Sequence, residues 1–325
     1  MRLSCAAAVA AALGALVSSV PAEAFCTDPN AIGVSRVLKL DTTSGLEVGR
    51  NEFHHTLALQ PKEVVLTFDD GPNPGTTDAV LSALEHQCTR ATFFLVGRMA
   101  LGSSHLVLAE EAAGHTIGTH TWGHPLDLQR RPAEDGIREI DDGIRAIAGV
   151  LGHEPAPFFR FPGLGHTSAL RAYLTEHHIG AFSIDAEGGD WLPTTPDQIR
   201  LRALSQLRAN NGGILLLHDT KTMTAAMLPQ LLADLQAEGF KIVQIVPSDE
   251  SLVASATTAP TGRVKARHAV TTAVATAPVP GSLPAGTPPP ILARNIAAPP
   301  RANPAVAQFG WSWPPRPFDA FPRTN

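Results

Sequence analysis

Residues 64–72 read Val-Val-Leu-Thr-Phe-Asp-Asp-Gly-Pro, and the rest of the chain is organised around this stretch. Its apolar, β-branched start predicts a strand, and the Gly-Pro pair predicts a turn directly after it. Asp69 and Asp70 therefore stand at a strand exit, where both carboxylates can turn towards one cleft. Because two like charges this close raise a pKa unless a cation neutralises one, the pair suits a metal ligand beside a general base. The alternative is a solvated turn, since Asp-Asp-Gly-Pro is also ordinary turn chemistry.

Further apolar runs recur along the chain, with helical patterns between them. The runs are 91–96, 115–118, 158–161, 181–184, 214–217 and 241–246, and the clearest helices are expected at 132–152, 196–209 and 228–235. Repeated alternation of strand and helix predicts a parallel sheet. Strands that are apolar throughout indicate that both faces are covered. We therefore expect an α/β fold in which about seven parallel strands form a closed or nearly closed barrel.

The composition limits the possible classes of function, and the N-terminus indicates the cellular compartment. The 325-residue chain is 44% hydrophobic with a formal net charge of −5, which allows one sizeable core and gives no sign of nucleic-acid binding. Arg2, an apolar run as far as Val20 and the triplet Ala22-Glu23-Ala24 predict that residues 1–24 are a signal peptide. A membrane anchor is the alternative, although the run is short and rich in alanine. We expect an exported protein, periplasmic or secreted, without a stable membrane anchor.

Cleavage of the signal would leave two cysteines, Cys26 and Cys88. An even pair in an exported chain predicts one disulfide, and two independent buried thiols are the alternative. Since no third cysteine remains, a thiolate zinc site is excluded and a metal would need histidine and carboxylate ligands.

Composition divides the mature chain into three parts. We expect an N-terminal extension packed on the barrel at 25–59, the barrel domain at 60–247 and a disordered tail at 248–325. The tail is rich in Ala, Pro and Thr and lacks apolar periodicity. Its aromatic end at 309–315 is either a short docking segment or an end without a partner.

Polar residues cluster where the predicted strands end, which is where active sites lie in parallel barrels. His120 and His124 have a spacing that would place both imidazoles on one side of a helical turn. Together with Asp70 they make a facial set for Zn²⁺ or a related divalent ion. On their own, two such histidines are more often surface residues.

Three more strand ends carry reactive groups. Arg160 can hold a carboxylate by a bidentate contact, or form only a surface ion pair. The loop at 185–191 contains three acids and an indole: Asp185, Glu187, Asp190 and Trp191. His218 follows an apolar strand and suits a general acid because its pKa lies near working pH; the alternative is a structural histidine.

The chain resembles the NodB-homology polysaccharide deacetylases, metal-dependent carbohydrate esterases with a distorted (β/α) barrel. The resemblance covers residues 60–246 and rests on five motifs in the family's order: TFDDGP (67–72), HTWGHP (120–125), RFPG (160–163), DAEGGDW (185–191) and LLLHD (215–219). It implies that Asp70, His120 and His124 bind the divalent metal, with Zn²⁺ first and Co²⁺ or Ni²⁺ as alternatives. It implies further that Asp69 is the general base and His218 the acid that protonates the leaving amine.

The resemblance also implies supporting roles. Arg160 would orient Asp69, Asp190 would tune His218, Trp191 would line the substrate groove, and the amide near Gly163 would help hold the oxyanion. Two departures from the family pattern bear on these roles. No aromatic residue separates Pro162 from Gly163, and Asp185 and Asp190 are five apart rather than three. Which of the two aspartates faces His218 is therefore left open.

These expectations describe a metal-dependent deacetylase that removes N-acetyl groups from an amino-sugar polysaccharide such as peptidoglycan or a chitin-like glycan. One alternative keeps the fold and the metal but acts on an O-acetylated glycan or a small cyclic amide. Another is a glycan-binding barrel without catalysis, against which the complete set of acid, base and ligands argues.

Overall fold

A computed structural model describes residue 28 and residues 30–252. The predicted signal peptide, Cys26 and the chain beyond Leu252 lie outside the described residues, so the predictions that fall on them stay predictions. Within the described part, no helix combines the length and apolar character needed to cross a membrane.

Every strand pairing in the described chain is parallel. The strands are β1 (Arg36–Leu40), β2 (Glu47–Val48), β3 (Glu63–Asp69), β4 (Thr92–Leu95), β5 (Thr116–Thr119), β6 (Phe158–Phe159), β7 (Gly180–Phe182), β8 (Ala186–Glu187), β9 (Gly212–His218) and β10 (Lys241–Pro247). They are ordered β1-β10-β3-β4-β5-β6-β7-β2, with β9 also paired to β3 and β8 paired to β9. The pairings form a branched path, and closure into a ring stays a prediction.

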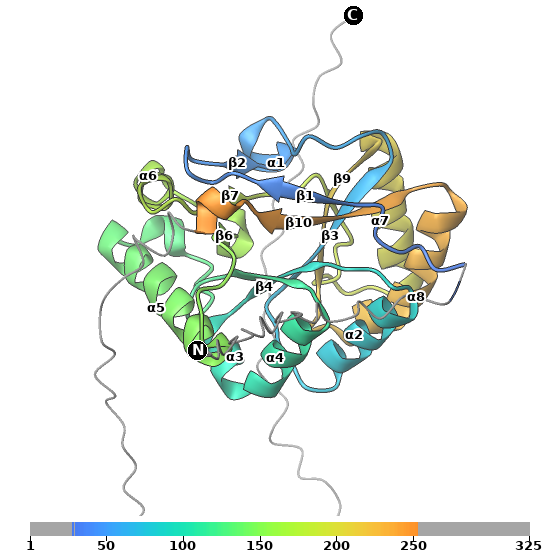
Figure 1. The fold of residues 1–325 in the computed structure, drawn as a ribbon, viewed down its shortest axis with the longest axis horizontal. Coiled ribbons are helices and arrows are strands. Elements are labelled where there is room, and N and C mark those ends of the chain that lie inside the picture. Colours follow the sequence, from blue (N-terminus) through green and yellow to red (C-terminus); the bar gives the residue numbers. More distant parts are fainter. Residues whose placement is uncertain (1–27, 29, 253–325) are drawn as a thin grey trace, which may run out of the picture. The chain divides into compact units, whose positions relative to one another are not determined.

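Helices lie around the outside of these strands (Figure 1). They are α1 (Arg50–Phe53), α2 (Thr76–His86), α3 (Gly97–Gly102), α4 (Ser104–Ala112), α5 (Ala133–Leu151), α6 (Ser168–Glu176), α7 (Pro196–Asn210) and α8 (Thr222–Ala237), with 3-10 turns η1 (Leu128–Arg130) and η2 (Pro162–Leu164). The three helices expected most clearly are α5, α7 and α8. Gly152 ends α5 in the left-handed conformation, as a glycine just past a helix end should.

All the predicted apolar runs form strands, so the parallel α/β class is confirmed. The N-terminal extension does more than pack on them, because it supplies two strands of its own. β1 pairs with β10, and β2 pairs with β7. The third strand without a predicted counterpart, β8, pairs with β9.

Strand β3 is the centre of the sheet and is buried at every position. Leu66 and Phe68 belong to a core with residues of α2, α7 and α8, whereas Val65 packs on the opposite face with Phe94 and other strand residues. A strand covered on both faces must be apolar throughout. Its carboxyl end is therefore packed on both faces, and Asp69 is its last residue.

The packed chain continues beyond Pro247, where the tail was expected to begin. Ser251 is fully buried. Its hydroxyl accepts a hydrogen bond from the Thr42 amide at 2.8 Å and donates one to the Leu40 carbonyl at 3.2 Å. Residues 248–252 therefore pack against the end of β1 and belong to the folded domain.

Candidate active site

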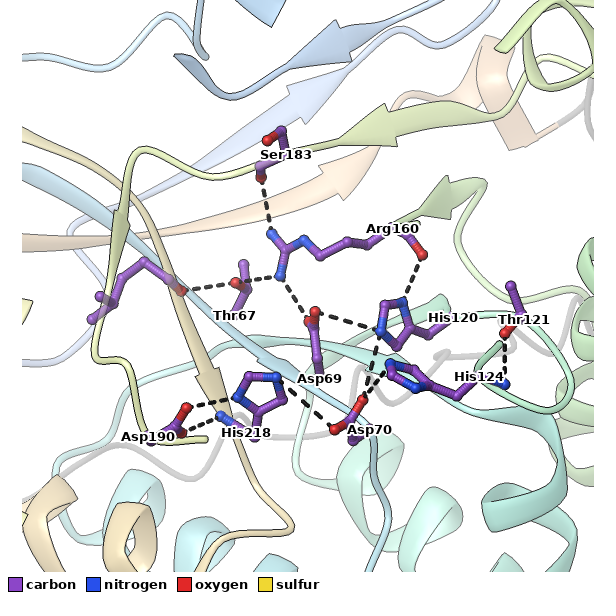
Figure 2. A network of polar contacts seen from close by, with 11 residues as sticks. Thr67, Asp69, Asp70, His120, Thr121, His124, Arg160, Ser183, Asp190 and His218 are labelled. Atoms are coloured by element: carbon purple, nitrogen blue, oxygen red, sulfur yellow. Dashed lines mark hydrogen bonds and ion pairs between the residues drawn. The ribbon is translucent and has the colours of Figure 1, made fainter. Parts of the chain in front are cut away.

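The carboxylates of Asp69 and Asp70 face the same site, as expected for adjacent residues at a strand exit (Figure 2). Asp70 makes this possible by adopting a φ of 77°, in the left-handed region. The next residue has to be glycine, since a Cβ on Gly71 would lie 2.1 Å from a carboxylate oxygen of Asp219. Asp69 is buried, whereas the side chain of Asp70 is 24% exposed.

His120 and His124 follow β5, but the helical turn expected between them is wrong. They lie in a loop in which Thr121 and His124 have φ values of 66° and 56°. The loop still brings the two imidazoles together, with ring centroids 4.8 Å apart. Their Nε2 atoms lie 3.6 Å and 3.0 Å from Asp70 Oδ1.

Asp70, His120 and His124 fit a divalent metal. Each offers one ligand atom, and these atoms lie within 4.8 Å of one another. The His120 Nδ1 lies 2.6 Å from the Arg160 carbonyl, so a proton held there leaves Nε2 free as a ligand. Asp70 Oδ1 is buried without a hydrogen bond although His124 Nε2 lies only 3.0 Å away, and a cation between them would satisfy both atoms.

The charge states around this set are those a metal needs. Burial lowers the pKa of His120 to about 4, so its ring is neutral at pH 7. Burial alone would raise the pKa of Asp70, but the positive charge of His218 and the nearby His124 hold that pKa well below its ordinary range. A neutral imidazole and an ionised carboxylate are the ligand forms that bind Zn²⁺.

Arg160 holds Asp69 and is completely buried. Its Nη1 donates to Asp69 Oδ1 at 2.7 Å and to the Thr67 hydroxyl at 2.8 Å. Its Nη2 donates to the Ser183 carbonyl at 3.2 Å, and the guanidinium lies 4.3 Å from the Phe94 ring centroid. The alternative of a surface ion pair is excluded by this burial.

His218 faces the site from β9 and is paired with Asp190. The ring Nδ1 lies 2.7 Å from Asp190 Oδ1, and the His218 amide donates to Asp190 Oδ2 at 2.8 Å. Its Nε2 lies 3.9 Å from Asp70 Oδ2. Burial lowers the pKa of His218, but the carboxylates of Asp190 and Asp70 outweigh it and raise that pKa to about 10. The ring is therefore an imidazolium that can donate a proton.

Asp185 has a different place, which answers the question left open by the sequence. Its side chain is fully buried and accepts hydrogen bonds from the Arg50 amide, the Thr56 hydroxyl and the Ile214 amide at 2.9, 2.5 and 2.8 Å. It thus ties the N-terminal extension to β9 and does not reach His218.

Trp191 and Gly163 lie nearer the solvent. Trp191 packs edge-on against His218 at a centroid distance of 5.7 Å and is 37% exposed. Gly163 is exposed in η2 with a φ of 57°. Among the described residues no hydrogen bond joins Gly163 to the rest of the site, so its oxyanion role stays a prediction.

Three supporting residues were missed in the sequence: Thr67, Ser183 and Thr224. Thr67 accepts from Arg160, and the Thr224 hydroxyl donates to Asp190 Oδ2 at 2.5 Å. A threonine inside the otherwise apolar run at 64–68 was a usable signal. The Ser183 contact is made by its backbone carbonyl, which no residue type encodes.

The fold and site define a parallel α/β protein with a cluster of carboxylates and imidazoles at the strand ends, three of which could hold a metal ion. Comparison with known proteins identifies its family. Residues 57–181 match the polysaccharide deacetylase family profile. A chitooligosaccharide deacetylase of Sinorhizobium fredii is 32% identical over 204 residues, covering 57% of this chain and 91% of that relative. The chain belongs to the polysaccharide deacetylase family.

Two further similarities concern peptidoglycan deacetylases. The peptidoglycan-N-acetylmuramic acid deacetylase PdaC of Bacillus subtilis is 29% identical over 195 residues, which are 60% of this chain and 40% of that relative. A peptidoglycan deacetylase structure from Bdellovibrio bacteriovorus superposes with a TM-score of 0.62 at 30% identity, covering 69% of this chain and 62% of that one. The match therefore spans less than half the length of PdaC.

Proposed function

We propose that this protein is a metal-dependent deacetylase that removes N-acetyl groups from an amino-sugar polysaccharide, either peptidoglycan or a chitin-like glycan. The observation that carries the proposal is the position of Asp69. It lies beside the Asp-His-His set, with Oδ1 held by Arg160 and Oδ2 directed to the metal ligands, 3.7 Å from His120 Nε2. The named activities of the relatives support the substrate class.

A divalent ion on Asp70, His120 and His124 would lower the pKa of water to about 7 and polarise the amide carbonyl. Asp69 accepts the proton of the attacking water through Oδ2. Arg160 fixes the orientation of Asp69, because its buried guanidinium donates a hydrogen bond to Oδ1.

His218 donates its proton to the leaving amine, from the opposite side of the site. Asp190 occupies Nδ1 and so leaves Nε2, directed towards Asp70, as the donating atom. Trp191 offers a half-exposed apolar face beside His218, suited to packing against a sugar ring. Export to the periplasm or the medium, where such polymers lie, is part of the proposal and is supported by the predicted signal peptide.

The test is Asp69→Asn, assayed for acetate release from N-acetylglucosamine oligomers and from peptidoglycan, with bound metal measured in the same samples. Loss of a general base should lower the rate by about 10²- to 10⁴-fold while the metal is retained. Asp135→Asn, a change at the start of α5, is the matched control and should leave the rate unchanged. Full activity of Asp69→Asn would refute the proposed role, and release of O-linked acetate only would change the substrate class.

A further inference from the structure

The loop that carries the two histidine ligands is conformationally unfavourable by itself. Thr121 and His124 both have a left-handed backbone, which is unfavourable for a residue with a side chain. Neither residue lies in a helix or a strand. Contacts from neighbouring elements must therefore hold the loop in the shape that directs His124 at Asp70.

Most of these contacts are made by backbone atoms. The Thr121 carbonyl accepts from the Gly97 amide at 2.9 Å, and the Trp122 carbonyl accepts from the Arg98 amide at 3.1 Å. Within the loop, the Thr121 hydroxyl accepts from the His124 amide at 3.0 Å. These bonds fix the start of the loop. The centre of the loop is held by a residue of α5.

Glu139 of α5 holds the centre of the loop at two consecutive amides. Its backbone carbonyl accepts from the Trp122 amide at 2.8 Å, and its side-chain Oε2 accepts from the Gly123 amide at 2.7 Å. The side chain is partly buried, and no ion pair among the described residues involves it. A carboxylate without a cation partner is thus directed at the amide immediately before His124.

We propose that Glu139 is a positioning residue for the metal ligand His124, acting through the Gly123 amide. A charge-assisted hydrogen bond to the residue before the ligand offsets the cost of the left-handed backbone. No hydrogen bond or ion pair among the described residues joins Glu139 to Asp70 or to the two imidazoles, so its effect would reach the metal through loop geometry. The inference rests on the proposed metal site, but its test does not depend on deacetylation.

The test compares Glu139→Ala with Glu139→Gln, whose side-chain carbonyl can accept the same hydrogen bond. Zn²⁺ affinity is measured by competition with a chromophoric chelator, and the Co²⁺ absorption spectrum reports ligand geometry. Removing a group that orients a metal-binding residue typically weakens metal affinity by about 10- to 100-fold. We expect a loss of Zn²⁺ affinity of this size for Glu139→Ala. Glu139→Gln keeps the acceptor but loses the charge, so its loss of affinity should be clearly smaller than that of Glu139→Ala.

Glu134→Ala is the matched control, because Glu134 lies exposed on the same helix and, among the described residues, no hydrogen bond or ion pair joins it to the loop. If Glu139→Ala does not fold, Glu139→Asp replaces it, since the shorter side chain keeps the charge but not the reach. Parent-like Zn²⁺ affinity in Glu139→Ala, or in Glu139→Asp when that variant replaces it, would overturn the inference. So would equal losses in the Gln and Ala variants. Failure of the parent protein to bind any divalent ion would instead overturn the proposed function.

Discussion

Arg160 allows a direct test of the site, because its guanidinium is buried and donates hydrogen bonds through both Nη1 and Nη2. Replacing it with methionine keeps a long side chain over Phe94 but removes the cation that lies 2.7 Å from Asp69. Asp69 is only 3% exposed, so its carboxylate would remain buried without a counter-ion. Water cannot readily replace the lost charge.

Breaking a buried ion pair from one side typically costs about 3–5 kcal/mol, and we expect Arg160→Met to lose that much stability. The same change should abolish acetate release, because Asp69 would lose the hydrogen bond that orients it as the base. Adding Asp69→Asn to Arg160→Met removes the unpaired charge. The double variant should therefore recover most of the stability and none of the activity.

Urea unfolding followed by circular dichroism measures the stability, and Arg171→Met is the control. Arg171 pairs with Glu47 at 3.0 Å, but its side chain is 34% exposed. Such a surface pair contributes about 0–1 kcal/mol. A loss below about 1 kcal/mol for Arg160→Met, equal to that of the control, would refute the account of a buried ion pair that holds the base.

Two other predictions concern Glu110 and Gly143, which lie outside the proposed catalytic set. Burial, reinforced by Asp219, raises the pKa of Glu110 well above its ordinary value of 4.5, so folding becomes less favourable as pH rises above 4.5. Glu110→Gln removes this penalty and should gain stability over the parent between pH 5 and 8, by up to about 1.4 kcal/mol per pH unit; a pH-independent difference in urea unfolding would contradict this. Gly143→Ala places a Cβ 2.6 Å from the Thr121 carbonyl carbon and should cost about 1–3 kcal/mol and weaken Zn²⁺ binding. Gly149→Ala on the same helix meets nothing within 4 Å and should instead stabilise by about 0.5–1 kcal/mol, so equal effects of the two changes on unfolding would count against the loop packing.

The buried strands could be predicted from the sequence because burial on both faces forces continuous apolar runs. β3 and β9 show this most clearly. β1 was missed because only part of it is buried, so it lacks such a run, and β2 and β8 are two residues long. Pairing with partners distant in sequence, rather than local pattern, makes these segments strands.

The site residues were predictable where a motif fixes both residue type and strand end, as at Asp69, Asp70 and His218. Geometry within loops was not predictable. The four-residue spacing of His120 and His124 suggested a helical turn, whereas left-handed residues produce the same convergence. Likewise, only the fold shows that Asp190 reaches His218 while Asp185 holds the N-terminal extension.

The most direct test of the central claim is acetate release by the purified protein from N-acetylglucosamine oligomers and from peptidoglycan, before and after chelation and after Zn²⁺ or Co²⁺ is restored. We predict release from at least one of these polymers, its loss on chelation and its return with the metal. Release that is indifferent to chelation, or no release by protein shown to hold the metal, would contradict a metal-dependent deacetylase of these glycans.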